Sequence, residues 1–217
     1  MRKKIVLLLA GAGAPLFLIV FLLAVIGTIL TGSSAAGQAA MDDAGGGVVS
    51  ENVLAYQPLI SQYCTQYGIS DYVPLVLAIM QQESGGVGND PMQCSESPDN
   101  LEYPHVPNGI TDPEYSIQVG VEYLASCLRA AGCTSPADIA HISLALQGYN
   151  LGGGYIAWAE AKGGYSLENA EEFSQLKAQE LRTGGYGDIN YVSHVLRYYN
   201  AMQLLGSGYF ICPISAG

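Results

Sequence analysis

The longest apolar stretch of the chain lies near its N-terminus. Residues 5–30 contain no charged side chain, and as a helix they would extend about 39 Å, more than the roughly 30 Å hydrocarbon core of a bilayer. Three basic residues, Arg2, Lys3 and Lys4, precede this stretch. Because basic flanks stay on the cytoplasmic side, we expect a cytoplasmic tail over residues 1–4, a transmembrane anchor over residues 5–30 and an extracytoplasmic body.

A cleaved signal peptide is the alternative to this anchor. Small residues at 34–36 and 37–39 resemble cleavage sites, but the apolar run is longer than the usual core of about 7 to 15 residues. A retained anchor in the cell membrane is therefore the preferred interpretation. Residues 31–50 are dominated by Gly, Ala and Ser and predict a flexible linker, because they bury too little surface to offset the entropy of ordering.

Beyond the linker, residues 51–206 carry helical patterns with almost no alternation of apolar and polar positions. Ile117, Val121 and Leu124, for example, recur in steps of four and three behind a typical helix start at 111–113. We expect helices over residues 56–67 and 73–84 (the second capped by Ser70 or Asp71), one opened by 111–113, one from 135–136 to 150, and two near 167–182 and 188–204. This pattern predicts a compact all-α domain.

Charge narrows the class of partner. Beyond residue 4 the chain holds five basic residues against 19 acidic ones. A body this acidic is a poor binder of nucleic acid, so we expect none among its partners.

The cysteines and histidines offer little chemistry. In an exported protein Cys127 and Cys133 could close a short disulfide loop, although the spacing leaves the pairing open, and the odd total of five cysteines leaves at least one thiol unpaired within the chain. There is no CxxC, HExxH or GxSxG motif, and pairing Cys94 with His105 rests on residue type alone. We therefore expect no metal and no cofactor.

Two acidic residues, Glu83 and Asp90, are better candidates for a catalytic role than the cysteines and histidines. Residues 73–80 are apolar on every side, which predicts a buried helix, and Glu83 follows at its C-terminal end before Gly85. Desolvation and the helix dipole both disfavour a carboxylate there, so the pKa of Glu83 should be raised, as a general acid requires. Asp90 follows on a glycine-containing loop, where we expect it to stay ionised. Two such carboxyl groups suit glycoside cleavage, although the spacing alone fits an exposed helix end and a turn equally well.

Several motifs then follow one another along about residues 51–205. They are Gln81-Gln82-Glu83-Ser84-Gly85-Gly86, Asp90-Pro91-Met92-Gln93, Asp112-Pro113-Glu114 leading into Ile117, Gly120, Tyr123 and Leu124, Ala145-Leu146-Gln147-Gly148-Tyr149-Asn150, and Tyr191-Val192 with Val195-Leu196. In this order they resemble the CwlT-like bacterial lysozyme domains, which belong to the goose-type lysozyme and soluble lytic transglycosylase group. The resemblance implies a lysozyme-like helical domain over residues 51–206.

The resemblance also implies roles for individual residues. It makes Glu83 the catalytic acid and Asp90 a second functional acid of a peptidoglycan hydrolase. It implies a substrate-binding cleft in which Tyr149 and Asn150 face the sugar and Tyr191 lies behind the catalytic carboxyl group. The other residues assigned to substrate binding are Met92, Gln93, Ser95 and Gln147. Cys94 stands where the family usually has Ser, and Leu151 where it often has Phe, so details of the cleft should differ.

Residues 207–217 form a separate C-terminal tail. Within it, residues 208–214 resemble the lead-in to a zinc endopeptidase of the lysostaphin type, without its metal ligands.

Taken with the anchor, the resemblance implies a membrane-anchored N-acetylmuramidase. Such an enzyme cuts the β-1,4 bond between N-acetylmuramic acid and N-acetylglucosamine, and the family suggests that it opens the wall for a conjugation or secretion apparatus. Two alternatives stay open: a lytic transglycosylase that leaves 1,6-anhydro ends, and a non-catalytic glycan-binding scaffold module.

Overall fold

The computed structural model of the protein describes residues 47–204. The expected cytoplasmic tail, the anchor over residues 5–30, most of the linker and the tail at 207–217 lie outside the described residues. Within the described part, no helix has both the length and the apolar character needed to cross a membrane.

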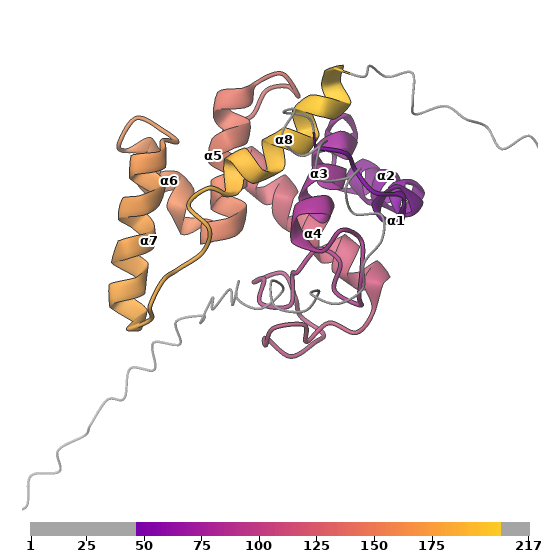
Figure 1. Ribbon diagram of the computed structural model, residues 1–217, viewed down its shortest axis with the longest axis horizontal. Coiled ribbons are helices and arrows are strands. Elements are labelled where there is room, and N and C mark those ends of the chain that lie inside the picture. The colour runs from indigo at the N-terminus through magenta and orange to yellow at the C-terminus, as the bar shows by residue number, and fades with distance from the viewer. Residues whose placement is uncertain (1–46, 205–217) are drawn as a thin grey trace, which may run out of the picture.

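Helices make up the regular structure of the described residues (Figure 1). In chain order they are α1 (Glu51–Ala55), α2 (Gln57–Gln66), the short 3-10 helix η1 (Ser70–Tyr72), α3 (Val73–Glu83), α4 (Pro113–Ala130), α5 (Ile139–Leu151), α6 (Gly154–Glu160), α7 (Leu167–Leu181) and α8 (Tyr191–Leu204). No strand occurs between residues 47 and 204. The expected all-α fold class is confirmed for this part of the chain.

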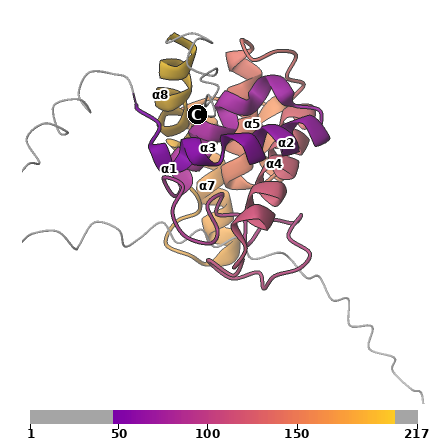
Figure 2. The same ribbon diagram turned by 90° about the vertical axis from the view of Figure 1, so that its right-hand side faces the viewer.

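Two buried helices organise the domain. On α5, every residue from Ile142 to Leu151 is buried, and α5 packs against α4, α6 and α8. On α3, every residue from 75 to 80 is buried, and α3 packs against α8 and α2. α8 lies between the α6–α7 pair on one side and α1–α3 on the other (Figure 1), and Figure 2 shows α1, α2 and α3 together on one face. The C-terminal end of α3 and the start of α8 therefore meet inside the fold.

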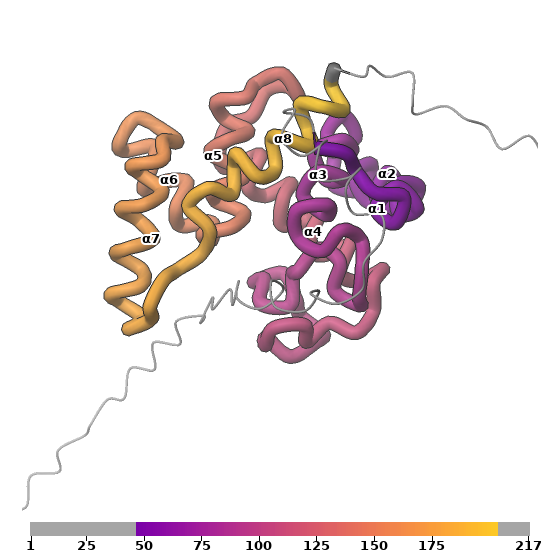
Figure 3. The backbone as a smooth tube through the Cα atoms, in the orientation of Figure 1, coloured from indigo at the N-terminus to yellow at the C-terminus, as the bar shows by residue number. Residues whose placement is uncertain are grey.

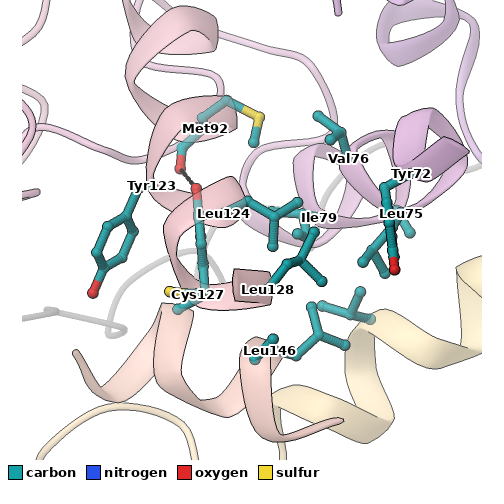
Figure 4. Packing of buried hydrophobic residues seen from close by; sticks show 14 of the residues in the cluster. Tyr72, Leu75, Val76, Ile79, Met92, Tyr123, Leu124, Cys127, Leu128 and Leu146 are labelled. Carbon is teal, nitrogen blue, oxygen red and sulfur yellow. Dashed lines mark hydrogen bonds between the residues drawn. The ribbon is translucent and has the colours of Figure 1, made fainter. Parts of the chain in front are cut away.

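The core between α3 and α4 is made of aliphatic side chains. Figure 4 shows Ile79 of α3 beside Leu124 and Leu128 of α4, with Met92 lying over them. Met92 comes from the long irregular connection between α3 and α4, residues 84–112, which is traced in Figure 3. Its side chain has no exposed surface. A Cβ on Gly120 would come within 2.7 Å of the Met92 Cβ, so the glycine allows this close approach.

Several helix boundaries differ from the expected ones. The helix expected over 56–67 is confirmed as α2, and a short helix that was not expected, α1, precedes it and is capped by Ser50. α3 follows a 3-10 turn and has Tyr72 at its N-cap without a side-chain hydrogen bond, so neither Ser70 nor Asp71 caps it. α5 begins after Asp138, whose carboxylate accepts the His141 N–H, rather than at 135–136.

Two further differences lie near the ends of elements. α6 was not expected, because Gly152, Gly153 and Gly154 favour a break in the chain at its start. Residues 47–50, expected as the end of the linker, lie against the domain: the Gly47 N–H donates to the Arg197 carbonyl, and Val49 is buried.

Candidate active site

Glu83 is the last residue of α3, at the point where a buried helix gives way to the long connection. Gly85 and Gly86 follow with φ of 64° and 75°, and a Cβ on Gly86 would lie 2.8 Å from the Val53 nitrogen. The Ser84 hydroxyl donates to the Pro91 carbonyl over 2.7 Å and accepts the Gly86 N–H. These contacts fold the chain back at once, so that Glu83 projects from a fixed helix end, as expected from the sequence.

The carboxyl group of Glu83 accepts a hydrogen bond from a tyrosine and has acidic surroundings. The Tyr191 hydroxyl donates to Glu83 Oε1 over 2.5 Å. Burial raises the pKa of Glu83 to about 7, the hydrogen bond from Tyr191 opposes this, and the charges of Asp90 and Asp188 add to the rise. The expected elevation of the pKa is confirmed, so Glu83 can hold a proton near neutral pH.

A set of tyrosines surrounds this group. Tyr149 stacks on Tyr191, with ring centroids 6.4 Å apart and planes at 16°, and Tyr123 packs against Tyr149 with ring centroids 5.3 Å apart. Burial holds the pKa of Tyr149 and Tyr191 well above the usual range, so both hydroxyls stay protonated. The stacked pair of tyrosines therefore ends at Glu83, which the Tyr191 hydroxyl contacts directly.

The Tyr149 hydroxyl contacts other groups of the protein. This hydroxyl lies 3.1 Å from Cys94 Sγ and donates to the Met92 carbonyl over 3.4 Å. Desolvation raises the pKa of the Cys94 thiol well above its usual range, so the thiol stays neutral. Tyr149 therefore joins the 92–94 segment to the Tyr191–Glu83 pair.

Asp90 is placed differently from the expectation of an open, polar loop. Its side chain is 2% exposed. Oδ1 accepts the Cys94 N–H at 2.9 Å and the Ser116 hydroxyl at 2.7 Å, while Oδ2 accepts the Ser95 N–H at 3.0 Å and the Ser95 hydroxyl at 2.5 Å. A carboxylate has about four acceptor positions, and all four are filled from within the protein.

Most of the expected substrate-binding residues are also buried. Gln147 has no exposed surface and its Nε2 donates to the Asp188 carbonyl over 2.9 Å, while the Asn150 Oδ1 accepts the Asp188 N–H at 2.7 Å. Met92 and Ser95 lie in the interior. The amide side chains of Gln147 and Asn150 therefore bind the Asp188 backbone instead of solvent.

Gln93 is the exception among the expected contacts. It is exposed, with φ of 49°, and its Nε2 donates to the Asp90 carbonyl at 2.9 Å and to Asn108 Oδ1 at 3.1 Å. Of the substrate-binding set, it is the one most open to a ligand.

Asp188, in the connection between α7 and α8, is a residue that the sequence did not point to. Its backbone joins Gln147 and Asn150 of α5, and its carboxylate accepts the Asn190 N–H at 2.9 Å and lies 2.7 Å from His194 Nδ1. Its side chain is 15% exposed. The one feature of the sequence that could have drawn attention to Asp188 is its position three residues before Tyr191.

The cysteines and the other metal-binding types of side chain can now be located in the structure. Cys127 and Cys133 are free thiols in the structure, so the short disulfide loop expected from their spacing is not formed. Burial raises the pKa of each to about 12. Among residues 47–204, no group of three or more His, Cys, Asp or Glu side chains is arranged to hold a metal ion.

The chain is similar to several known proteins. A family model described as lysozyme-like matches residues 50–210. The chain is 36% identical over 204 residues to the bifunctional muramidase/DL-endopeptidase CwlT of Bacillus subtilis, covering 90% of this chain and 57% of that protein. It is 33% identical over 163 residues to the uncharacterized membrane protein YocA of the same organism, covering 68% of each.

A solved structure is similar as well. The crystal structure of a protein from Staphylococcus aureus, described as similar to lipoprotein, NLP/P60 family, matches with a TM-score of 0.58 and 39% identity. The match covers 71% of this chain and 54% of that chain. The chain thus spans little more than half the length of CwlT and of this structure.

Proposed function

The chain belongs to the lysozyme-like family, and from that premise we propose that it is an N-acetylmuramidase that hydrolyses the β-1,4 bond between N-acetylmuramic acid and N-acetylglucosamine in peptidoglycan. Membership and the similarity to CwlT support a peptidoglycan-cleaving enzyme. The observation that carries the proposal is the Glu83 carboxyl group at the end of α3, with a pKa of about 7 and the Tyr191 hydroxyl on one of its oxygens.

This geometry suits proton donation to a glycosidic oxygen. Because Tyr191 donates to Oε1, the proton of neutral Glu83 belongs on Oε2, which is the oxygen we assign to the substrate. A general acid works best when its pKa lies close to the working pH, and the pKa of Glu83 meets that condition near neutrality. In the reaction, Glu83 would protonate the leaving oxygen as the sugar develops positive charge.

A lytic transglycosylase is a second candidate, and the burial of Asp90 favours it. Hydrolysis by two carboxyl groups needs the second one to meet water or the sugar, whereas the four acceptor positions of Asp90 are occupied. A transglycosylase operates with one carboxyl group, because the hydroxyl of the muramic acid residue itself attacks. The name of the relative CwlT, a muramidase, weighs in favour of hydrolysis.

Mass spectrometry of digested glycan strands tests the proposal. Purified peptidoglycan treated with the protein should yield reducing muramic acid ends, and the Glu83→Gln variant, digested in parallel, serves as the blank. Products uniformly lighter by one water would show 1,6-anhydro ends and establish the transglycosylase instead. Binding to glycan strands without any new ends would establish the scaffold module.

For location, we propose that residues 5–30 anchor the domain on the outer side of the cell membrane. The uncharged apolar stretch with its basic flank supports this, and a relative is described as a membrane protein. Protease added outside the cell should digest the domain, and a shortened species that starts near Gly37 or Ala40 would establish cleavage. Work for a conjugation or secretion apparatus stays a prediction from the family resemblance.

A further inference from the structure

The buried network around Asp90 reaches beyond the four bonds on its carboxylate. The Ser116 hydroxyl that donates to Asp90 also accepts the Met92 N–H at 3.1 Å. The Ser95 hydroxyl that donates to Asp90 also accepts the Ile110 N–H at 2.9 Å. Through these two hydroxyls and its direct bonds, Asp90 gathers the backbone N–H groups of residues 92, 94, 95 and 110.

This arrangement fixes the 92–95 segment against α4. Ser116 lies on α4 and is fully buried, and Met92 packs into the space left by Gly120 of the same helix. Buried N–H groups must be paired, and here one carboxylate supplies the pairing for several of them. Removal of Asp90 would therefore release the segment rather than only delete a charge.

The segment in turn supports Tyr149. Its hydroxyl contacts Cys94 Sγ and the Met92 carbonyl, both of which lie in the stretch that Asp90 holds. The ring of Tyr149 stacks on Tyr191, whose hydroxyl donates to Glu83. Direct contacts therefore lead without a gap from Asp90 to the carboxyl group proposed as the acid.

We infer that Asp90 is a positioning residue, which serves the reaction by holding the 92–95 segment and Tyr149 behind the Tyr191–Glu83 pair, and that it does not act as the second carboxylate on water or sugar. The inference rests on the proposed function of Glu83. It differs from the role that the family resemblance implies for a second acid, since an oxygen with both acceptor positions filled by internal donors has none left for a ligand.

The test compares variants that break the network at different points. Asp90→Asn places an amide group where the network needs only acceptors, and Ser116→Ala removes one hydroxyl that is buried on α4. Both should lower kcat, Asp90→Asn by about 10²-fold as is typical of a misplaced catalytic group, with KM changed less than about twofold. The substrate is solubilised peptidoglycan, and thermal melting verifies folding.

The matched control is Ser97→Ala. Ser97 is a buried serine of the same connection whose hydroxyl accepts the Asp99 N–H and makes no bond to Asp90. Its variant should keep wild-type kcat. Adding Tyr149→Phe to Asp90→Asn should cause little further loss, because both changes interrupt the same chain of contacts.

Small anions separate positioning from direct catalysis. Sodium azide or formate can replace a missing carboxylate that acts on the sugar or on water, but cannot restore a network that holds backbone. No rescue of Asp90→Asn, together with a lowered kcat for Ser116→Ala, supports the inference. Rescue of Asp90→Asn by either anion, or wild-type kcat in Ser116→Ala, overturns it.

Two other outcomes are distinguishable from these. If Asp90→Asn does not fold, Ser116→Ala and Ser95→Ala carry the test, since each removes one hydroxyl and leaves the carboxylate. If Glu83→Gln cleaves as fast as the wild type, the proposed function fails, whatever the Asp90 variants do.

Discussion

Glu83 at the end of α3 and Asp90 in the connection between α3 and α4 are the two acidic residues of the candidate site, and their surroundings differ: Glu83 is partly exposed, whereas Asp90 is buried. Among the described residues, Glu83 receives a side-chain hydrogen bond from Tyr191, and burial raises its pKa to about 7. Asp90 receives four hydrogen bonds, two from backbone N–H groups and two from serine hydroxyls. The Glu83 carboxyl group thus has few hydrogen-bond donors around it, whereas every acceptor position of the Asp90 carboxylate is occupied by a donor.

This contrast shows how a protein assigns different work to chemically similar groups. A carboxyl group with few donors is easily protonated and can pass its proton on, as a general acid does. A carboxylate saturated by donors has no acceptor position left and contributes by fixing the groups that donate to it. Substitutions at the two acidic residues and at their neighbours should therefore have different effects.

The largest effect is expected at Glu83. Replacing it by Gln removes the proton but keeps the oxygen that accepts from Tyr191, so the fold should persist while wall lysis falls by about 10²-fold to 10⁴-fold or more. Lysis zones on gels containing cell wall, and release of reducing ends in solution, measure the loss. If Glu83→Gln produces lysis zones as large as those of the wild type, Glu83 is not the catalytic acid.

The place of Glu83 could be predicted from the sequence because the signals were local. Residues 73–80 are all apolar, so the buried helix and its end at Gly85 follow from the chain itself. The start of α4 at Asp112–Pro113 and nearly the full extent of α7 were predicted for the same reason. α6 was missed because the three glycines at its start favour a loop, and its packing on α5 decides otherwise.

The burial of Asp90 could not be predicted in this way. Its partners include Ser116, which lies 26 residues further along the chain on another helix. A Gly- and Pro-containing stretch is normally exposed, so the local pattern favoured an open loop. The same holds for Asp188, whose importance comes from its contacts with Gln147 and Asn150 and is not visible in any local motif.

A smaller effect is expected on the pH dependence of kcat/KM, which two substitutions near Glu83 should shift in opposite directions. Activity requires protonated Glu83, so kcat/KM should decline as pH rises through about 7. Tyr191→Phe removes a hydrogen bond that lowers the pKa of Glu83 and should move this decline to higher pH. Asp188→Asn removes a charge that raises the pKa and should move it to lower pH.

The pair of variants is measured as full pH profiles against the wild type. Asp71→Asn, which removes an exposed carboxylate from η1, is the control for general loss of negative charge. Shifts of Tyr191→Phe and Asp188→Asn in the same direction, or an equal shift in Asp71→Asn, would contradict the local origin of the pKa of Glu83.

The smallest expected effect is on stability, and it again separates the two acidic residues. The pKa of a glutamate in the unfolded chain is about 4.5, and burial raises the pKa of Glu83 to about 7 in the fold. Between these values the folded protein binds more protons than the unfolded chain, so the contribution of Glu83 to stability is fully present below about 4.5 and is lost as pH rises through about 7.

Glu83→Gln does not titrate, so this variant should melt at a higher temperature than the wild type above pH 7 and lose that advantage near pH 4. Partial solvent contact screens the charge, and the gain should be only about 2 to 4 °C, which corresponds to roughly 1 kcal/mol in a domain of this size. Asp90→Asn should instead melt lower than the wild type at every pH, because an amide cannot accept from all four donors. Melting curves of the three proteins from pH 4 to pH 8 measure both effects. If the melting temperature of Glu83→Gln exceeds that of the wild type by the same amount at pH 4 and at pH 8, the pKa of Glu83 is not raised in the folded protein.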